Sequence, residues 1–367
     1  MRCGKIVFHR NLFSMTRFRA AMDFPQFISF TVTNSCNLRC RMCGQWSEDG
    51  YVRNRTVAER PRMKLEDWKR LIDEAAHHKI RFVLVRGGEP FLFPGIIELL
   101  QYVNHKGIFV SVDTNGTLLE RFADDLSRID HMHITFSVDG PEDVHDRVRE
   151  RKGSFAKIRE NIALLQSLEN KNGNTISKSI CFTISNDNYD SLGAMADVAR
   201  TLSISSVNIV PFYHFSNAVG HQYEEELQDN FRCTPFSWRG FHRENSGIEF
   251  DRFKQGLRAY LASLEGIQNF PYMSFSEDAY RSWFADQTTP VGSPACGNVE
   301  KLMDIQPDGG ANFCVDFPDY SFGNVKGSSI EEVWNSREAE SFRVYRRHHP
   351  LAICYRCGAK YISEIKE

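Results

Sequence analysis

The chain has 367 residues, of which 41% are hydrophobic and 25% are charged, enough to build one large domain and a smaller one. Its formal net charge of −2 argues against a partner attracted by bulk charge, such as nucleic acid or an anionic membrane, and favours a small molecule or a peptide as substrate. No apolar run reaches the roughly 18 residues of a membrane span and no secretory signal is evident, so we expect a cytoplasmic protein.

The first 24 residues carry five Lys or Arg side chains, opposed only by Asp23. Aromatic and aliphatic residues such as Phe8, Leu12 and Phe18 are mixed with these basic residues. We therefore expect residues 1–24 to be a leader that packs against the domain that follows.

Apolar strands alternate with amphipathic helices between residues 27 and 211, which predicts consecutive β-α units and a parallel sheet. Six units are fewer than the eight of a closed barrel, so the predicted fold is α/β, a partial (β/α)6 TIM-type barrel over residues 25–211. Such barrels carry their chemistry at the carboxyl ends of the strands. The predicted strands are residues 27–33, 81–86, 109–113, 133–138, 179–184 and 207–211, and the predicted helices are residues 64–78, 94–105, 118–129, 155–168 and 189–202.

Cys36, Cys40 and Cys43 follow the first predicted strand in a C-x3-C-x2-C pattern. Three thiolates can hold three irons of a four-iron cubane and leave the fourth iron open. An open position is typical of a catalytic metal site. Close spacings of this kind make poor disulfide frameworks in a large cytosolic protein, whereas they suit metal binding.

Other motifs follow later strands. In Arg86-Gly87-Gly88-Glu89-Pro90, paired glycines allow the backbone to approach a ligand and the carboxylate can accept from a charged amine. Asn115-Gly116 ends the third strand, where a plain turn is an equal explanation.

The fourth strand ends in Ser137-Val138-Asp139-Gly140-Pro141. Arg147, Arg149 and Arg151 follow, and the planar guanidinium fork of an arginine suits the geometry of a carboxylate.

These motifs, in this order, resemble those of the radical S-adenosylmethionine (SAM) enzymes. The resemblance implies that Cys36, Cys40 and Cys43 hold a 4Fe-4S cluster whose open iron chelates SAM, and that reductive cleavage of SAM yields a 5'-deoxyadenosyl radical. Met42 departs from the aromatic residue found in many members, and its thioether can fill a similar apolar slot. The cofactor contacts that the resemblance implies are Gly87, Gly88, Glu89, Pro90, Asn115, Ser137, Asp139 and Arg149. In the family such a Ser and Arg contact the ribose and the carboxylate of SAM, and Arg147 and Arg151 are alternatives to Arg149 as the carboxylate partner.

Four more cysteines, Cys296, Cys314, Cys354 and Cys357, gather near the end of the chain. Taken alone they fit either a zinc ribbon or an iron-sulfur cluster. Their spacing and flanking residues resemble the SPASM/Twitch extension of radical SAM enzymes. This resemblance implies one auxiliary 4Fe-4S cluster with four thiolate ligands, held by a domain over residues 296–367.

Residues 212–295 connect the two predicted domains and are rich in aromatic side chains, most of them expected in the core and a minority in a substrate pocket. Cys233 lies in this region. It is either an inert buried thiol or, if it faces SAM, a hydrogen-atom donor that would make the enzyme an epimerase.

The predicted function is reductive cleavage of SAM, followed by hydrogen abstraction from a small-molecule or peptide substrate, with oxidation, cross-linking or epimerisation as the outcome. The alternative is an iron-sulfur electron-transfer or sensing protein without radical chemistry. The predicted cofactors are two 4Fe-4S clusters and SAM, and the predicted protein partner is a low-potential electron donor such as flavodoxin or ferredoxin.

Overall fold

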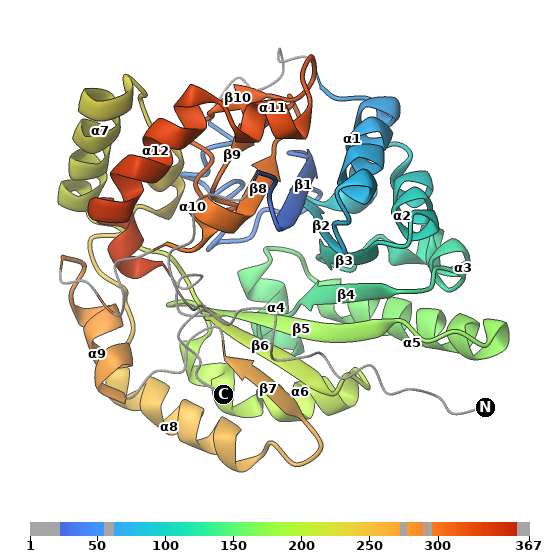
Figure 1. The fold of residues 1–367 in the computed structure, drawn as a ribbon. Helices are drawn as coiled ribbons and strands as arrows, with labels where there is room; N and C mark the ends of the chain where they lie inside the picture. The colour runs from blue at the N-terminus through green and yellow to red at the C-terminus, as the bar shows by residue number, and fades with distance from the viewer. Residues whose placement is uncertain (1–22, 55–61, 272–276, 289–290, 292–295, 358–367) are drawn as a thin grey trace.

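The computed structural model describes residues 23–54, 62–271, 277–288, 291 and 296–357. Within these ranges the strands form one sheet in the order β10-β9-β8-β1-β2-β3-β4-β5-β6-β7. Every neighbouring pair from β8 to β7 is parallel, whereas β9 and β10 add on in antiparallel orientation. Among the described residues the sheet does not close, because β10 and β7 remain its two edges, and the fold is a partial barrel (Figure 1).

The helices on the outer side of the barrel follow the strands in sequence (Figure 1). The strands are β1 (Phe27–Thr33), β2 (Phe82–Gly87), β3 (Phe109–Thr114), β4 (Met132–Ser137), β5 (Ser177–Ile184), β6 (Ser206–Pro211), β7 (Gln268–Pro271), β8 (Leu302–Ile305), β9 (Gly310–Asn312) and β10 (Gly323–Asn324). The α-helices are α1 (Leu65–His77), α2 (Ile96–His105), α3 (Ala123–Leu126), α4 (Glu142–Val148), α5 (Ser154–Asn172), α6 (Met195–Thr201), α7 (Asn217–Phe231), α8 (Phe250–Ala262), α9 (Glu277–Ala285), α10 (Asn298–Lys301), α11 (Ile330–Trp334) and α12 (Arg337–His348), and the 3-10 helices used below are η4 (Leu119–Arg121), η5 (Tyr189–Ala194), η6 (Ser237–Phe241) and η7 (Ala352–Arg356).

The six predicted strands are β1 to β6, with each end within two residues of its expected place. The helix expected at residues 118–129 is instead split into η4 and α3, because Phe122 has a φ of −126°, outside the helical region. The helix expected at residues 189–202 begins as the 3-10 turn η5 and continues as α6. Two strands, β7 and β8, extend the parallel sheet beyond the six predicted units.

Side chains of opposite character occupy the two faces of the sheet. Ile28, Phe30 and Val32 of β1 are at most 3% exposed, and they belong to the core beneath the helices. The residues between them are polar, and in-register neighbours in a parallel sheet share a face. The register therefore places polar side chains of neighbouring strands together on the second face of the sheet, which we call the polar face. Its members include Ser29, Thr31, Arg86, Ser111, Asp113, His133, Thr135, Ser137, Ser179, Cys181, Asn208 and Asp304.

Residues 212–271 and 277–288 contribute α7, η6, α8, β7 and α9, and β7 pairs with the barrel strand β6. Large aromatic side chains from this region, such as Phe215, Trp238 and Phe253, are fully buried, as expected for core residues. The leader predicted at residues 1–24 lies outside the described residues except for Asp23 and Phe24.

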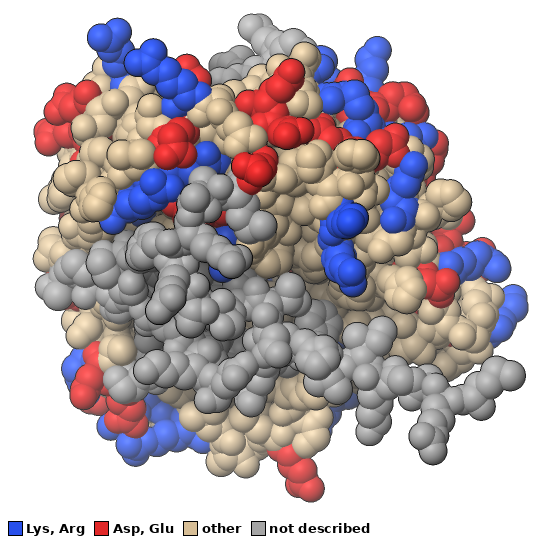
Figure 2. Space-filling view, viewed as in Figure 1, with Lys and Arg blue, Asp and Glu red and all other residues tan. Residues whose placement is uncertain are grey.

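Lys, Arg, Asp and Glu are interspersed over the face shown in Figure 2, which fits a formal charge close to zero. Within the described ranges, no helix has the length and apolar character required to cross a membrane.

One buried ion pair joins a barrel strand to its covering helix. Lys178 Nζ of β5 lies 2.7 Å from both carboxylate oxygens of Glu169 on α5, and the two side chains are 8% and 5% exposed. Removing one partner of such a pair leaves an uncompensated charge away from water. We predict that Lys178→Met lowers the free energy of unfolding by about 3–5 kcal/mol in urea titrations followed by circular dichroism.

The matched control is Asp124→Ala, which breaks the exposed pair between Asp124 and Arg128 on the same flank. This substitution should lower the free energy of unfolding by less than about 1 kcal/mol. Equal losses in the two variants would contradict the assignment of Lys178 and Glu169 as a buried pair.

Candidate active site

The three cysteines of the first motif lie on one short loop directly after β1. Cys40 is buried, and Cys36 and Cys43 are partly buried. Cys36 Sγ accepts from the Leu38 N–H at 3.5 Å, and Cys43 Sγ accepts from the Trp46 N–H at 3.4 Å. These contacts fold the loop around its own sulfurs.

The thiols of Cys36 and Cys40 lie close enough to Cys43 for charge on its sulfur to affect them. Burial, together with the neighbouring thiols, raises the pKa of Cys36 to about 11 and that of Cys40 to about 12, although Arg149 opposes the rise in both. Metal coordination requires thiolates, so iron binding here would release protons. The donor set fits a cluster with three protein ligands. No group of three or more His, Cys, Asp or Glu side chains in the described ranges has the arrangement of a single-ion metal site.

The glycines after β2 allow that strand to touch the cysteine loop. A Cβ on Gly87 would lie 2.4 Å from the Thr33 carbonyl oxygen, and one on Gly88 would lie 2.4 Å from the Ser35 carbonyl oxygen. The Gly88 N–H donates to Thr33 O at 2.7 Å, and the Glu89 N–H donates to Ser35 O at 2.8 Å. The glycine pair is therefore required for the motif to pack against the loop.

Glu89 is fully buried and held on both oxygens. Thr114 Oγ1 donates to Oε1 at 2.7 Å, the Phe91 N–H donates to the same oxygen at 3.2 Å, and the Asn115 N–H donates to Oε2 at 2.8 Å. Burial raises the pKa of Glu89 to about 7, although these hydrogen bonds and Arg149 oppose the rise. A ligand ammonium group beside Glu89 would favour the ionised form.

Asn115 does more than form a turn. Its Nδ2 donates to Asn37 Oδ1 at 2.9 Å, and Asn37 Nδ2 donates to Thr117 Oγ1 at 2.9 Å. The end of β3 is thus tied to the loop that carries the cysteines.

Of the three candidate arginines, Arg149 alone points inward. Its Nε lies 2.5 Å from Asp139 Oδ2, and its Nη1 donates to Cys40 Sγ at 3.6 Å. Arg149 is 8% exposed and Asp139 is fully buried, whereas Arg147 and Arg151 are exposed. Arg149 therefore joins the fourth strand to the cysteine loop, and Asp139 fixes its orientation.

Ser137 ends β4 on the polar face, in register with Cys181 of β5. Burial raises the pKa of Cys181 to about 12, with smaller effects from Asp113, Asp139 and Arg149, so this thiol lies close to the same groups. No role was predicted for Cys181 from the sequence. The alternation of Ser179, Cys181 and Thr183 with buried apolar residues would have placed it on the polar face.

Arg86 connects the polar face to the C-terminal segment. Its guanidinium lies 3.7 Å from Asp316, two residues after Cys314, and Tyr213 also donates to Asp316, at 2.9 Å. Burial opposes the charge on Arg86, but Asp316, Asp304 and Asp113 together raise its pKa above the ordinary value. This role of Arg86 was missed because it depends on a residue 230 positions away in sequence.

The four C-terminal cysteines, all partly buried, gather around one guanidinium. Arg346 of α12 is 3% exposed and donates through Nη2 to Cys354 Sγ at 3.4 Å. Burial alone would lower the pKa of Arg346, but the cysteines raise it, so their sulfurs lie within electrostatic reach of its charge. The cysteines that raise it are Cys354, Cys296, Cys357 and Cys314.

Cys233 follows α7 and contacts the C-terminal segment. Its thiol donates to the Asp319 carbonyl oxygen at 3.1 Å, and burial raises its pKa to about 11. Besides burial, the charge that affects Cys233 is that of Asp319, whereas Cys181 is affected by Asp113, Asp139 and Arg149.

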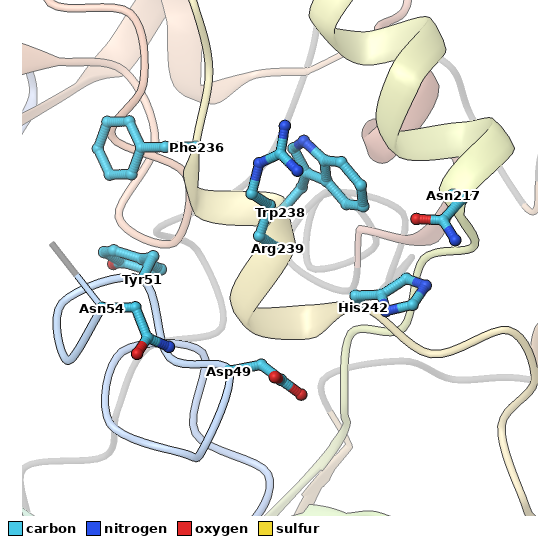
Figure 3. Close-up of a pocket in the computed structure, with 8 residues that line it drawn as sticks. All are labelled: Asp49, Tyr51, Asn54, Asn217, Phe236, Trp238, Arg239 and His242. Carbon is cyan, nitrogen blue, oxygen red and sulfur yellow. The ribbon is translucent and has the colours of Figure 1, made fainter.

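A pocket of about 350 Å³ opens between the loop after Cys43 and η6 (Figure 3). In this pocket the rings of Tyr51 and Phe236 pack edge to face, with centroids 5.6 Å apart. The lining residues are Asp49, Tyr51, Asn54, Asn217, Phe236, Trp238, Arg239 and His242.

The raised pKa of Glu89 predicts a pH dependence of stability. Between pH 4.5 and 7 the folded protein holds more protons on Glu89 than the unfolded chain does. The stability contributed below pH 4.5 is therefore lost as the pH rises through 7. As the pH rises from 5 to 8, the free energy of unfolding of wild type should therefore fall by about 2 kcal/mol more than that of Glu89→Gln, measured by urea unfolding of the cluster-free protein.

Comparing each variant with itself at two pH values cancels the altered hydrogen bonds of the amide. Glu160→Gln, at an exposed position of α5, serves as the control. A Glu89→Gln protein with the same pH dependence as wild type would refute the raised pKa.

Two family models match the chain. Residues 30–199 match the radical SAM superfamily, and residues 296–358 match SPASM, an iron-sulfur cluster-binding domain. Each match includes one of the two groups of cysteines described above.

Similar proteins cover most of the chain at low identity. An Fe-coproporphyrin III synthase of Methanosarcina barkeri is 23% identical over 90% of this chain and 78% of that protein. The sporulation killing factor maturation protein SkfB of Bacillus subtilis is 23% identical over 74% of this chain and 65% of that protein.

The crystal structure of Streptococcus suis SuiB bound to its precursor peptide SuiA superposes with a TM-score of 0.62 at 14% identity, over 95% of this chain and 74% of that one. This likeness shows a shared fold. Because both family models match in the order in which the cysteine motifs occur, the chain belongs to the radical SAM superfamily and carries a C-terminal SPASM domain.

Proposed function

We propose that this radical SAM enzyme modifies a peptide substrate held against the polar face of its partial barrel. The observation that carries the proposal is that Cys36, Cys40, Glu89 and Arg149 meet at the carboxyl edge of the sheet. When bound there, the cluster and SAM supply an electron and a 5'-deoxyadenosyl radical that removes a hydrogen atom from the substrate.

Each part of SAM has a matching group in the chain. Cys36, Cys40 and Cys43 would ligate three irons, leaving the fourth for the methionyl group. Glu89 would accept from the methionyl ammonium, and Arg149 would donate to the carboxylate through its planar fork.

Asp139 supports this role of Arg149 because it pairs with Nε and fixes the guanidinium plane, while the terminal nitrogens lie on the side of Cys40, to which Nη1 donates. Ser137 carries a hydroxyl on the same polar face, suited to the ribose. Buried charges of opposite sign, held before SAM arrives, reduce the reorganisation that binding requires.

A peptide suits the polar face, which offers many hydroxyl groups together with Arg86, Asp113 and His133. The names of SkfB and SuiB support this choice, since one is a maturation protein and the other was solved with a precursor peptide. The second candidate is a tetrapyrrole, favoured by the similarity to an Fe-coproporphyrin III synthase over 78% of that protein.

Cys296, Cys314, Cys354 and Cys357 are proposed to hold one auxiliary 4Fe-4S cluster. A substrate that loses a hydrogen atom to the radical, and then an electron and a proton, is oxidised by two electrons in total. The auxiliary cluster would accept the electron that leaves in the second step. The contact from Arg86 to Asp316, two residues after Cys314, places this segment against the polar face, so a cluster held there would lie on the substrate side and could serve an oxidative outcome such as cross-linking.

Epimerisation would instead need a thiol that returns a hydrogen atom to the substrate radical. Cys233 stays our prediction for that donor, with its thiol directed at Asp319 O. Cys181 is the second candidate, since it lies on the polar face beside Ser137.

The test is anaerobic reconstitution with iron and sulfide, followed by SAM and dithionite. We expect about eight irons per chain and formation of 5'-deoxyadenosine in wild type. Cys36→Ala/Cys40→Ala/Cys43→Ala should keep about four irons and form no 5'-deoxyadenosine, because the SAM-binding cluster is lost.

The matched control is Cys354→Ala/Cys357→Ala, which should lose the auxiliary cluster and still form 5'-deoxyadenosine. Zinc in place of iron, or cleavage of SAM by the triple variant, would contradict the proposed ligand sets.

A further inference from the structure

Arginine side chains gather on the outer side of the loop that carries the first three cysteines. Arg39 is exposed, donates to the carbonyl oxygens of Cys36 and Leu38 at 2.9 and 2.7 Å, and lies over the Trp46 ring at 4.2 Å. Arg41 is the next arginine of the same loop, with a side chain 46% exposed.

Three arginines from other segments reach the same place. Arg151 Nη1 lies 3.5 Å from the Asn37 carbonyl oxygen, and Arg243 Nη2 lies 3.4 Å from the Arg41 carbonyl oxygen. Arg147 donates to the Asp187 carbonyl oxygen at 3.1 Å. We call this set the arginine collar, and its members are Arg39, Arg41, Arg147, Arg151 and Arg243.

The collar keeps an excess of positive charge. Arg41 lies 3.4 Å from Glu150 and 3.3 Å from Asp187, and Arg243 lies 3.8 Å from Asp49. Counting ion pairs among the described residues, five guanidinium groups thus face three carboxylates, whereas the whole chain has a formal charge of −2. The inward Arg149 differs because Asp139 pairs with it.

We propose that the arginine collar is the docking surface for an acidic electron-donor protein that reduces the SAM-binding cluster. The inference rests on the proposed function, in which SAM cleavage consumes one electron from outside the protein. The reduced flavin or iron-sulfur centre of the donor loses that electron and the cluster gains it, with no bond made or broken.

The collar suits this task by position and by charge. Its arginines donate to the backbone of the loop that bears the proposed cluster ligands, so a docked donor faces that loop directly. A positive patch speeds the encounter with an acidic protein, and added salt weakens the effect.

The test compares two reductants of different size and charge. Initial rates of 5'-deoxyadenosine formation are measured with flavodoxin hydroquinone and with dithionite, in wild type and in Arg41→Glu/Arg243→Glu. We expect the variant to lose about tenfold in the flavodoxin-driven rate at low ionic strength and to keep the dithionite-driven rate. Sodium chloride should slow the flavodoxin-driven reaction of wild type much more than that of the variant.

Arg128→Glu/Arg159→Glu, at exposed positions on α3's C-terminal side and on α5, is the charge-matched control and should behave as wild type with both reductants. If the Glu variant does not fold, Arg41→Gln/Arg243→Gln should show a smaller loss in the same direction.

An unchanged flavodoxin-driven rate would overturn the proposal. An equal loss with both reductants would also overturn it, because the arginines would then act on SAM or on the cluster. If wild type forms no 5'-deoxyadenosine even with dithionite, the proposed function is wrong, and the proposed docking surface is then wrong as well.

Discussion

The site depends on a backbone contact that leaves no room for a side chain. Gly87 and Gly88 lie against residues 33–35. The N–H groups of Gly88 and Glu89 donate to carbonyl oxygens of this segment, and these two hydrogen bonds fix the end of β2 to the start of the cysteine loop. Any Cβ at either glycine would meet a carbonyl oxygen at 2.4 Å, and backbone cannot yield as a flexible side chain can. The position of Glu89, and with it the hydrogen bonds to Thr114 and Asn115, follows from this contact.

A second set of contacts holds residues 212–271 and 277–288 and the C-terminal segment on the barrel. Gly240 and Gly44 approach so closely that a Cβ on Gly240 would meet the Gly44 oxygen at 1.9 Å. Phe241 packs on Phe317 with ring centroids 5.4 Å apart, and Asp319 accepts from the Phe236 and Ser237 N–H groups at 2.7 and 2.9 Å. The two cysteine groups are therefore connected through η6.

Local patterns in the sequence predicted most of the barrel. The strands β1 to β6 are short apolar runs between turn residues, and the motifs after them occur at the edge where the prediction placed them. The split of residues 118–129 into two short helices was missed, since it depends on the backbone conformation at Phe122 and the apolar spacing continues through it. The addition of β7 and β8 was missed because pairing between distant strands leaves no local pattern.

The residues of the candidate site were also marked by local patterns in the sequence. Spacing alone marked Cys36, Cys40 and Cys43. Arg149 was predicted as a contact of the SAM carboxylate, and the structure places it inward, beside Cys40. The sequence alone could not predict that Arg86 pairs with Asp316, because this contact joins segments far apart in the chain. It also could not place Cys181 beside Ser137, because that neighbour is set by the register of the sheet.

The pairing of β8 with β1 also affects the order in which the protein can assemble. Phe27 is in register with Leu302, so the first strand of the barrel finds its second neighbour only after some 270 residues have been added. Chains are synthesised from the N-terminus, and domains generally fold as they emerge. The cysteine loop follows the strand that waits longest for its partner. During synthesis the thiols of Cys36, Cys40 and Cys43 therefore sit beside an open sheet edge, and the barrel around them is completed last.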